Sequence, residues 1–339
     1  MRVLLALGGN AMSAADGSAT PGAQQAAVAS AMESVAALIV AGHEVVITHG
    51  NGPQVGNLLV KNELAAAVVP PVPLDWCGAQ TQATIGFTMI NALERSLTRR
   101  GCATRVAAIV TRTRVDESDP GFADPTKPIG RFLPYDKAKK LIEHGQVWHD
   151  RGEKGWRRMV ASPAPLEVLE TGVVLTLIAA GYVVVAAGGG GIPVVSVPDG
   201  SVRGVEAVID KDLTAALLAR SVNADVLVIA TDVDNAVTGY GTVAAAAIHS
   251  VTLEEMREIA SAGHFASGSM GPKVAAAMQF VEQGGQRAVI TSLENIESSI
   301  TSNVGTVIVG RADPARHSVQ DRSAQDRSVQ DHSEHSNER

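Results

Sequence analysis

Cysteine and aromatic residues are scarce in this chain of 339 residues. Its two cysteines, Cys77 and Cys102, provide neither a disulfide framework nor the paired spacing of a zinc site, which favours a reducing compartment. Aromatic residues make up only 3% of the sequence, although hydrophobic residues make up 45%. The core must therefore be built from Ala, Val, Leu and Ile, a composition that suits buried parallel strands backed by helices with small side chains.

The chain also lacks an excess of positive charge and a long hydrophobic run. Its formal net charge is -7, which argues against a general nucleic-acid-binding protein. The first apolar stretch, 2–7, is too short for a signal peptide and is followed at once by glycines. No apolar run approaches the roughly 20 residues that a membrane span needs. We therefore expect a soluble, cytoplasmic globular protein that binds neither nucleic acid nor membrane.

What the sequence does contain is an alternation of strand-like and helix-like segments. Short apolar runs predict strands, and apolar residues at i, i+3 and i+4 predict helices. The expected strands are 3–7, 44–48, 106–110, 182–187, 225–230, 287–291 and 305–309. The expected helices are 23–41, 77–100, 171–180, 252–262, 273–283, one that begins near 210–212 and one whose first turn holds Pro53. This alternation predicts an α/β fold with an open, mainly parallel sheet sandwiched by helices.

Two stretches interrupt the alternation. Residues 113 to about 163 are rich in charge, proline and glycine, and we expect a small inserted lid subdomain with one helix near 135–144. Residues 312–339 carry a polar Ser-x-Gln-Asp repeat that cannot bury a core, so we expect a disordered tail. Residues 1–311, including the insertion, are expected to form one main domain.

The charged segment Asp210-Lys211-Asp212 joins an apolar run to a helical pattern. Charges this close to a core are tolerated when they are paired or used. From this segment alone two interpretations stay open: a helix N-cap with a structural ion pair, or a phosphate-binding lysine held by two carboxylates. A second lysine, Lys273, lies in the first turn of an expected helix, where it opposes the helix dipole unless an anion binds there. Such lysines provide the charge neutralisation that phosphoryl transfer needs.

Glycine-rich loops follow three of the expected strands, at 8–9, 50–52 and 188–191. In an open parallel sheet, ligands bind outside the carboxyl ends of the strands, where glycine lets backbone N–H groups approach an anion. Each loop alone is weak evidence for a ligand site, because tight turns between a strand and a helix also use glycine for steric reasons. The sequence has no GxxxxGK[ST] loop and no GxGxxG after its first strand, which disfavours P-loop and Rossmann folds.

Six motifs occur in a fixed order and spacing between Met1 and about Val309. They are Ala6-Leu-Gly-Gly-Asn-Ala11, Thr48-His-Gly-Asn-Gly-Pro-Gln-Val-Gly56, Pro125-Thr-Lys-Pro-Ile-Gly130, Ala187-Gly-Gly-Gly-Gly-Ile-Pro193, Glu206-Ala-Val-Ile-Asp-Lys-Asp212 and Gly263-His-Phe-Ala-Ser-Gly-Ser-Met-Gly-Pro-Lys273. Together they strongly resemble the motifs of carbamate kinases, a branch of the amino-acid-kinase fold. The resemblance implies reversible phosphoryl transfer between ATP and carbamate, giving ADP and carbamoyl phosphate, with Mg²⁺ bridging the nucleotide oxygens.

The resemblance also implies a role for each matched residue. The residues implied to bind the transferred phosphoryl are Gly8, Gly9 and Asn10, and those implied to bind carbamate are Gly50, Asn51, Gly52 and, from the lid, Lys127. The implied catalytic residues are Lys211, Lys273, Asp212 and Lys127, with Asp212 positioning the lysines. The implied nucleotide pocket holds Thr231, Asp232, Val233, Tyr240, Ser269, Met270 and Lys273. The resemblance implies no metal ligand from the protein; it implies a homodimer, and ATP synthesis in arginine or agmatine breakdown.

Carbamate is already an oxyanion, so the implied chemistry needs no general base. His49 and His264 are therefore more readily interpreted as packing or hydrogen-bonding residues. Cys77, inside a helical pattern, is interpreted as a buried small hydrophobe. Two residues depart from the family pattern, because Ser267 and Arg131 stand where proline is expected. The alternative for Lys127 is a surface ion pair with Asp124.

Two other functions stay open. A kinase of the same fold acting on an amino-acid carboxylate would need a larger pocket with an Arg or Lys at its far end, and the Pro-Thr-Lys-Pro segment argues against it. The second is a non-catalytic, nucleotide-binding regulator. A sensor does not need the full phosphoryl-transfer set, so the presence of Asn10, Lys127, Lys211, Asp212 and Lys273 argues against a regulator.

Overall fold

The structure, a computed structural model, describes residues 1–9, 20–265 and 269–310. Three features named in the sequence analysis lie outside the described residues: Asn10, Ser267 and the polar tail at 312–339.

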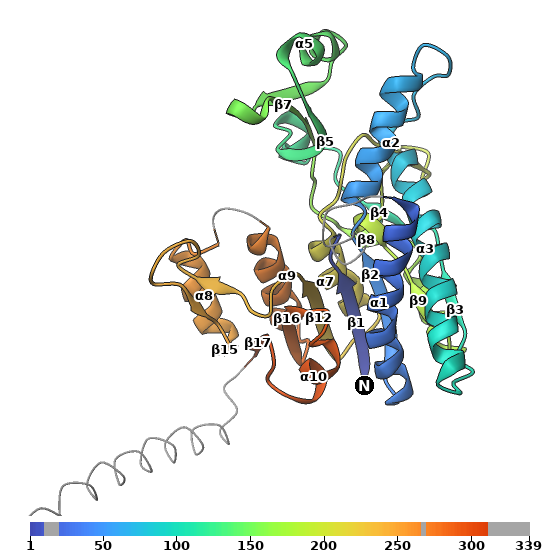
Figure 1. Cartoon of the computed structure of the whole chain (residues 1–339), viewed down its shortest axis with the longest axis vertical. Helices are drawn as coiled ribbons and strands as arrows, with labels where there is room; N and C mark the ends of the chain where they lie inside the picture. The colour runs from blue at the N-terminus through green and yellow to red at the C-terminus, as the bar shows by residue number, and fades with distance from the viewer. Residues whose placement is uncertain (10–19, 266–268, 311–339) are drawn as a thin grey trace, which may run out of the picture.

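An eight-stranded sheet forms the centre of the molecule (Figure 1). Its order is β15 (Ser250–Thr252), β17 (Thr306–Val309), β16 (Arg287–Ser292), β12 (Val226–Thr231), β1 (Arg2–Leu7), β2 (Glu44–His49), β9 (Val183–Val185) and β3 (Val106–Ala108). Neighbouring strands are parallel except β16 and β17, which are antiparallel. The expected α/β fold with an open, mainly parallel sheet is confirmed.

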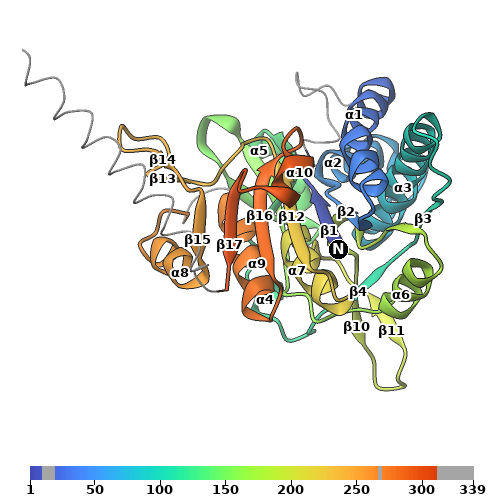
Figure 2. The same cartoon turned by 90° about the horizontal axis from the view of Figure 1, so that it is seen from below.

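Helices cover both faces of this sheet (Figure 2). One face carries α1 (Pro21–Val40), α3 (Leu74–Arg99) and α10 (Ile296–Thr301). The other carries α6 (Thr171–Ala179), α7 (Lys211–Ser221), α8 (Leu253–Ser261) and α9 (Met270–Glu282). Val3, Leu5 and Leu7 of β1 enter the first core, and Leu4 and Ala6 enter the second, because successive side chains of a strand point to opposite faces.

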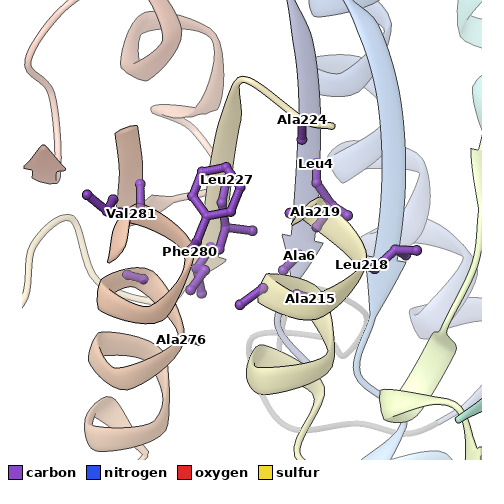
Figure 3. Packing of buried hydrophobic residues seen from close by; sticks show 14 of the residues in the cluster. Leu4, Ala6, Ala215, Leu218, Ala219, Ala224, Leu227, Ala276, Phe280 and Val281 are labelled. Atoms are coloured by element: carbon purple, nitrogen blue, oxygen red, sulfur yellow. The ribbon is translucent and has the colours of Figure 1, made fainter. Parts of the chain in front are cut away.

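Small side chains let α7 pack closely on the sheet. Figure 3 shows Ala219 of α7 beside Leu4 of β1, Ala215 further along the same helix, and Phe280 of α9 next to Leu227 of β12. All five side chains are fully buried. The expectation of a core built from Ala, Val, Leu and Ile is therefore confirmed, and the position of α7 fixes where its N-terminal charged segment meets the sheet.

Helix α1 corrects one statement made from the sequence. It is the one helix in the described ranges that is long and apolar enough to cross a membrane by length and composition. Alanine and valine give it this character, and Glu33 is its only charged residue. It packs in the core beside α3, and its buried residues are Val28, Ala31, Met32, Val35, Ala36, Leu38 and Ile39. A buried core helix of this composition meets the same criteria of length and hydropathy, so these criteria alone do not indicate a membrane span.

Two smaller sheets stand outside the alternation and were not predicted in detail. One has the order β11 (Val202–Gly204), β10 (Ile192–Ser196), β4 (Arg112–Arg114) and β8 (Glu167–Val168). The other is the hairpin of β13 (Val237–Thr238) and β14 (Ala246–Ala247). The remaining elements of the main domain are α2 (Gly52–Ala65), α4 (Pro120–Ala123) and a 3₁₀ turn at Gly188–Gly190.

Within the insertion expected at 113 to about 163, residues 127–160 project from the main body near the end of α2 (Figure 1), and we call these residues the inserted subdomain. It consists of β5 (Lys127–Leu133), α5 (Tyr135–Glu143), β6 (Val147–Asp150), the 3₁₀ turn Gly152–Lys154 and β7 (Trp156–Val160), with the strand order β5-β7-β6. Leu133, Ala138 and Trp148 form its small core. A unit this small has few side chains to bury, so large aromatic rings supply much of its packing area.

Candidate active site

Two glycine loops meet at the carboxyl ends of β1 and β2. The Gly50 N–H donates to the Leu7 carbonyl at 2.9 Å, and the Gly8 N–H donates to the Ala230 carbonyl of β12 at 3.0 Å. A Cβ atom added at Gly50 would lie 2.9 Å from the Gly9 nitrogen and 3.3 Å from the Lys211 side chain. Any side chain there would push the loops apart, so glycine at this position is a requirement of close approach.

The lysines of two different helices converge on one buried carboxylate next to these loops. Asp212, in the first turn of α7, is 3% exposed and accepts from Lys211 through Oδ1. Its Oδ2 accepts from Lys273 of α9 at 3.1 Å, and Lys273 is only 7% exposed. Two ammonium groups therefore face one carboxylate, which leaves a net positive charge in a largely buried place. The structure brings together the three residues that the sequence placed at the centre of the site.

The ammonium of Lys211 is easier to deprotonate than an exposed lysine. Burial lowers its pKa, and the positive charge of Lys273 adds to that effect, while the Asp212 carboxylate opposes it. An anion bound between the two lysines would favour their charged forms. This is the electrostatic character of a phosphate-binding site.

The inserted subdomain contributes a third lysine. Lys127, the first residue of β5, donates to Asp210 Oδ2 at 2.9 Å. The sequence left open a surface ion pair of Lys127 with Asp124, but the observed partner of Lys127 is Asp210. Asp210 is the N-cap of α7, and its Oδ1 accepts from the backbone N–H of Asp212 at 2.9 Å and of Leu213 at 3.4 Å. The helix N-cap of the first interpretation is therefore observed at Asp210. Lys211 pairs with Asp212, whereas Asp210 pairs with Lys127, and phosphate binding by Lys211 stays a prediction.

These groups line one cleft of about 570 Å³, which we call the lysine cleft. Its lining residues are Gly9, Gly50, Asn51, Gly52, Pro53, Lys127, Pro128, Gly189, Val208, Ile209, Asp210, Lys211, Asp212, Ser269, Pro272 and Lys273. The cleft lies where ligands bind in open α/β sheets, outside the carboxyl ends of the strands. The expected phosphate, substrate and catalytic residues thus share one space, apart from Gly8, just before this lining, and Asn10, which lies outside the described residues.

The residues expected at the nucleotide pocket are more dispersed. Ser269 lines the cleft as the N-cap of α9, and Met270 begins that helix. Thr231 ends β12, beside the first glycine loop, and Asp232 and Val233 follow it. Tyr240 stands in the turn between β13 and β14, is 84% exposed and does not line the cleft. The lysine cleft and the end of β12 are therefore adjacent, while Tyr240 is presented to solvent.

Two buried amide side chains hold the glycine loops in place: Asn51, which the sequence analysis named, and Gln82, which it missed. Asn51 donates to Thr81 at 2.9 Å, so its side chain is already engaged. Gln82 of α3 donates to the carbonyl oxygens of Thr111 and Gly188, each at 3.0 Å, and accepts from the Thr111 N–H at 2.8 Å. It fixes the third glycine loop against α3. The signal was present in the sequence, since a glutamine three residues before Ile85 on an apolar helical stripe needs a buried partner.

Both histidines of interest have structural partners. His49 is 1% exposed, and its Nδ1 donates to the Gly50 carbonyl at 2.8 Å. Burial lowers the pKa of His49 to about 4. His264 Nδ1 accepts from the Gly239 N–H at 3.2 Å. Cys77 is fully buried, and burial raises the pKa of its thiol, as suits a small core residue.

His49 should make folding stability depend on pH. The pKa of His49 is about 4 in the folded protein, below its ordinary value of 6.5. Between these two pH values His49 is therefore protonated in the unfolded chain but neutral in the folded protein. The stability that depends on neutral His49 is therefore fully present above pH 6.5 and is lost progressively as the pH falls to 4. At pH 5 the free energy of unfolding should be lower than at pH 7 by about 2 kcal/mol from this residue.

Urea unfolding at both pH values measures this difference. His49→Asn keeps a donor for the Gly50 carbonyl but cannot titrate, so the difference should shrink by that amount. The exposed His144 provides a control, and His144→Asn should leave it unchanged. An undiminished pH dependence in His49→Asn would assign the effect to other groups.

Arg131, which stands where the family pattern has proline, makes a specific contact. Its guanidinium pairs with Glu63 of α2 at 2.7 Å, so it joins the inserted subdomain to the main domain. A proline at this position could not make this contact.

No cluster of three or more His, Cys, Asp and Glu side chains within residues 1–9, 20–265 and 269–310 is arranged to hold a metal ion. The two carboxylates of the cleft are each engaged by a lysine. The donor set of the cleft suits anions, and a cation would have to bring anionic ligands with it.

The chain belongs to the amino acid kinase family, whose model matches residues 1–292. Within that family its similarity is to carbamate kinases. It is 43% identical over 311 residues to the carbamate kinase of Pyrococcus furiosus, covering 91% of this chain and 99% of that protein. It is 44% identical over 310 residues to carbamate kinase 1 of Enterococcus faecium, covering 91% and 98%.

A solved structure extends this similarity to the fold. The carbamate kinase of Giardia lamblia, bound to AMP-PNP, is 40% identical and superposes with a TM-score of 0.86, covering 91% of this chain and 98% of that chain. The resemblance found in the motifs is therefore confirmed along nearly all of the relatives' length.

Proposed function

We propose that this protein is a carbamate kinase, which transfers a phosphoryl group reversibly between ATP and carbamate to give ADP and carbamoyl phosphate. The observation that carries the proposal is the convergence of Lys211, Lys273 and Lys127 with two glycine loops in one cleft. Phosphoryl transfer needs alignment and charge neutralisation more than covalent help from the protein. The 40–44% identity to carbamate kinases over 91% of the chain supports the choice of substrate.

Each group has a task in this reaction. Lys211 and Lys273 neutralise the oxygens of the transferring phosphoryl, and Asp212 holds the two ammonium groups in place. Backbone N–H groups of the loops at 8–9 and 50–52 bind the phosphoryl and carbamate oxygens. Carbamate is an oxyanion and attacks without a general base, which is consistent with the buried neutral state of His49.

We further propose that Mg²⁺ enters with the nucleotide, held by its phosphate oxygens. The metal would supply additional charge neutralisation at the phosphates. The nucleotide itself is proposed to lie along the end of β12 and the start of α9, near Thr231, Asp232, Val233, Ser269 and Met270, with Tyr240 on the hairpin beside it. We also propose a soluble, cytoplasmic homodimer that works toward ATP synthesis in arginine or agmatine breakdown. Exposed Trp76 and Phe87 on α3, 60% and 61% exposed, support an interface on that helix.

A coupled assay tests the function directly. The purified chain is given ADP, Mg²⁺ and carbamoyl phosphate, and ATP is measured with hexokinase and a dehydrogenase. Formation of ATP that depends on carbamoyl phosphate is expected. Glutamate or aspartate with ATP should give no turnover, and turnover with either would favour the amino-acid-kinase alternative. Binding of nucleotide without turnover on any of these substrates would favour the regulator.

Lys127→Met should separate the substrate from the nucleotide. The Lys127 side chain reaches the cleft from the inserted subdomain, and the glycine loop at 50–52, proposed to bind carbamate, lines the same cleft. Its loss should therefore raise KM for carbamoyl phosphate and lower kcat. KM for ADP should change little. Steady-state kinetics with each substrate varied in turn provide the measurement. Equal weakening of ADP would place Lys127 on the nucleotide, and unchanged kinetics would leave it a structural ion pair.

A further inference from the structure

Within the described residues, three ion pairs join the inserted subdomain to the main domain. They are Lys127–Asp210 at 2.9 Å, Arg131–Glu63 at 2.7 Å and Arg158–Glu206 at 3.2 Å. Lys127–Asp210 is the one whose two members both line the lysine cleft. The resemblance to carbamate kinases implied roles for Lys127 and Asp212 but none for Asp210.

The Asp210 carboxylate performs two tasks with its two oxygens. Oδ1 caps α7 by accepting from the backbone N–H of Asp212 and Leu213, and Oδ2 accepts from the Lys127 ammonium. Its side chain is 14% exposed, whereas that of Lys127 is 35% exposed. The helix cap fixes the rotamer of Asp210, so the carboxylate is a rigid anchor and the lysine is the more mobile partner.

Asp210 is held in its ionised form. Burial alone would raise the pKa of its carboxyl, but the charge and hydrogen bond of Lys127, with the two capping N–H groups, outweigh burial and set the pKa below its ordinary value. The Asp210 carboxylate is therefore charged at neutral pH.

We propose that Asp210 is a positioning residue for phosphoryl transfer, holding the Lys127 ammonium over the cleft and thereby coupling the inserted subdomain to the helix that carries Lys211 and Asp212. This inference rests on the proposed function. An ammonium group has three donors, so one bond to Asp210 leaves two for substrate oxygens. Asp210 acts through Lys127 and need not touch the reacting atoms. A resting contact that withholds Lys127 from the substrate would have the opposite effect on activity.

Asp210→Asn tests the coupling because asparagine caps a helix as well as aspartate does and removes only the charge. The melting temperature should stay near that of the wild type. The kcat/KM for carbamoyl phosphate should fall by about 10- to 100-fold, since a displacement of about 1 Å costs on that scale. KM for ADP should remain within about twofold. Asp210→Ala should show the same kinetic loss and a lower melting temperature, because it also loses the cap.

Two further variants distinguish positioning from general damage. In the Lys127→Met background, Asp210→Asn should cause almost no additional loss, because a residue that acts through Lys127 has nothing left to position. Glu63→Gln breaks the Arg131 pair, which joins the same two parts of the molecule, and its kcat/KM should stay near the wild-type value.

Several results would overturn the proposal: an unchanged or raised kcat/KM in Asp210→Asn, a loss that multiplies with that of Lys127→Met, or an equal loss in Glu63→Gln. A wild-type protein without turnover on ADP and carbamoyl phosphate would refute the proposed function alone. The coupling is then tested by amide hydrogen exchange, which should be faster in β5 for Asp210→Asn than for the wild type. Unchanged exchange in β5 would refute the coupling itself.

Discussion

Replacing Lys273 or Lys211 with alanine should lower kcat at least about 100-fold. Each substitution removes one preorganised positive charge from the cleft, and the loss of one such transition-state contact is of this order. Lys273 is 7% exposed and Lys211 only partly exposed, so solvent cannot replace either charge cheaply. KM should rise less than kcat falls, because charge accumulates on the phosphoryl oxygens as the bonds change.

The coupled assay with saturating ADP and carbamoyl phosphate provides the measurement. Lys139→Ala, an exposed lysine on α5, is the matched control and should keep wild-type turnover. Circular dichroism and the melting temperature establish that the variants are folded. A folded Lys273→Ala or Lys211→Ala protein with near-wild-type kcat would remove that lysine from the mechanism.

Asp212→Asn should be the most damaging single change, because it affects folding and activity together. The substitution preserves shape but leaves two ammonium groups facing each other without a buried negative charge. Breaking a buried pair by removing one partner costs about 3–5 kcal/mol. Turnover should also collapse, since neither Lys211 nor Lys273 keeps its position.

Chemical denaturation and the coupled assay measure the two effects. A second substitution separates them: Asp212→Asn with Lys211→Met removes one of the two opposed positive charges, so it should recover part of the lost stability and none of the activity. A wild-type free energy of unfolding in Asp212→Asn would mean that the lysines are not compensated by this carboxylate. Stability recovered together with activity in the double variant would contradict the assigned catalytic role of Lys211.

The local elements were predictable because their causes are local. The strand at 3–7 was expected from a short apolar run and is observed at Arg2–Leu7, and the helix expected at 23–41 is Pro21–Val40. Helix α9 begins at Met270, three residues before the expected start, so Lys273 is in its first turn. These patterns depend on residues within about four positions of one another, which is the range that sequence periodicity reports.

The inserted region was only partly predictable. Its helix was expected near 135–144 and is observed at Tyr135–Glu143, but the strand order β5-β7-β6 could not be derived. Antiparallel pairing in a small, polar sheet depends on turns and on a few aromatic contacts, which leave no strong periodic pattern. Strand β4, just before it, joins a different sheet with β10 and β8, and nothing local indicates that choice.

The sequence by itself determined the α/β fold, the positions of the glycine loops at strand ends and the residues that carry charge near them. Only the tertiary structure decided how those charges pair. Asp212 meets a lysine 61 positions away and Asp210 meets one 83 positions away, so the pairing depends on which strands are neighbours in the sheet. The same segment could serve as a helix cap or as a lysine clamp while its partners were unknown. Folding brings α9 and β5 to the N-terminus of α7, and the two aspartates take separate roles there because their side chains face different lysines.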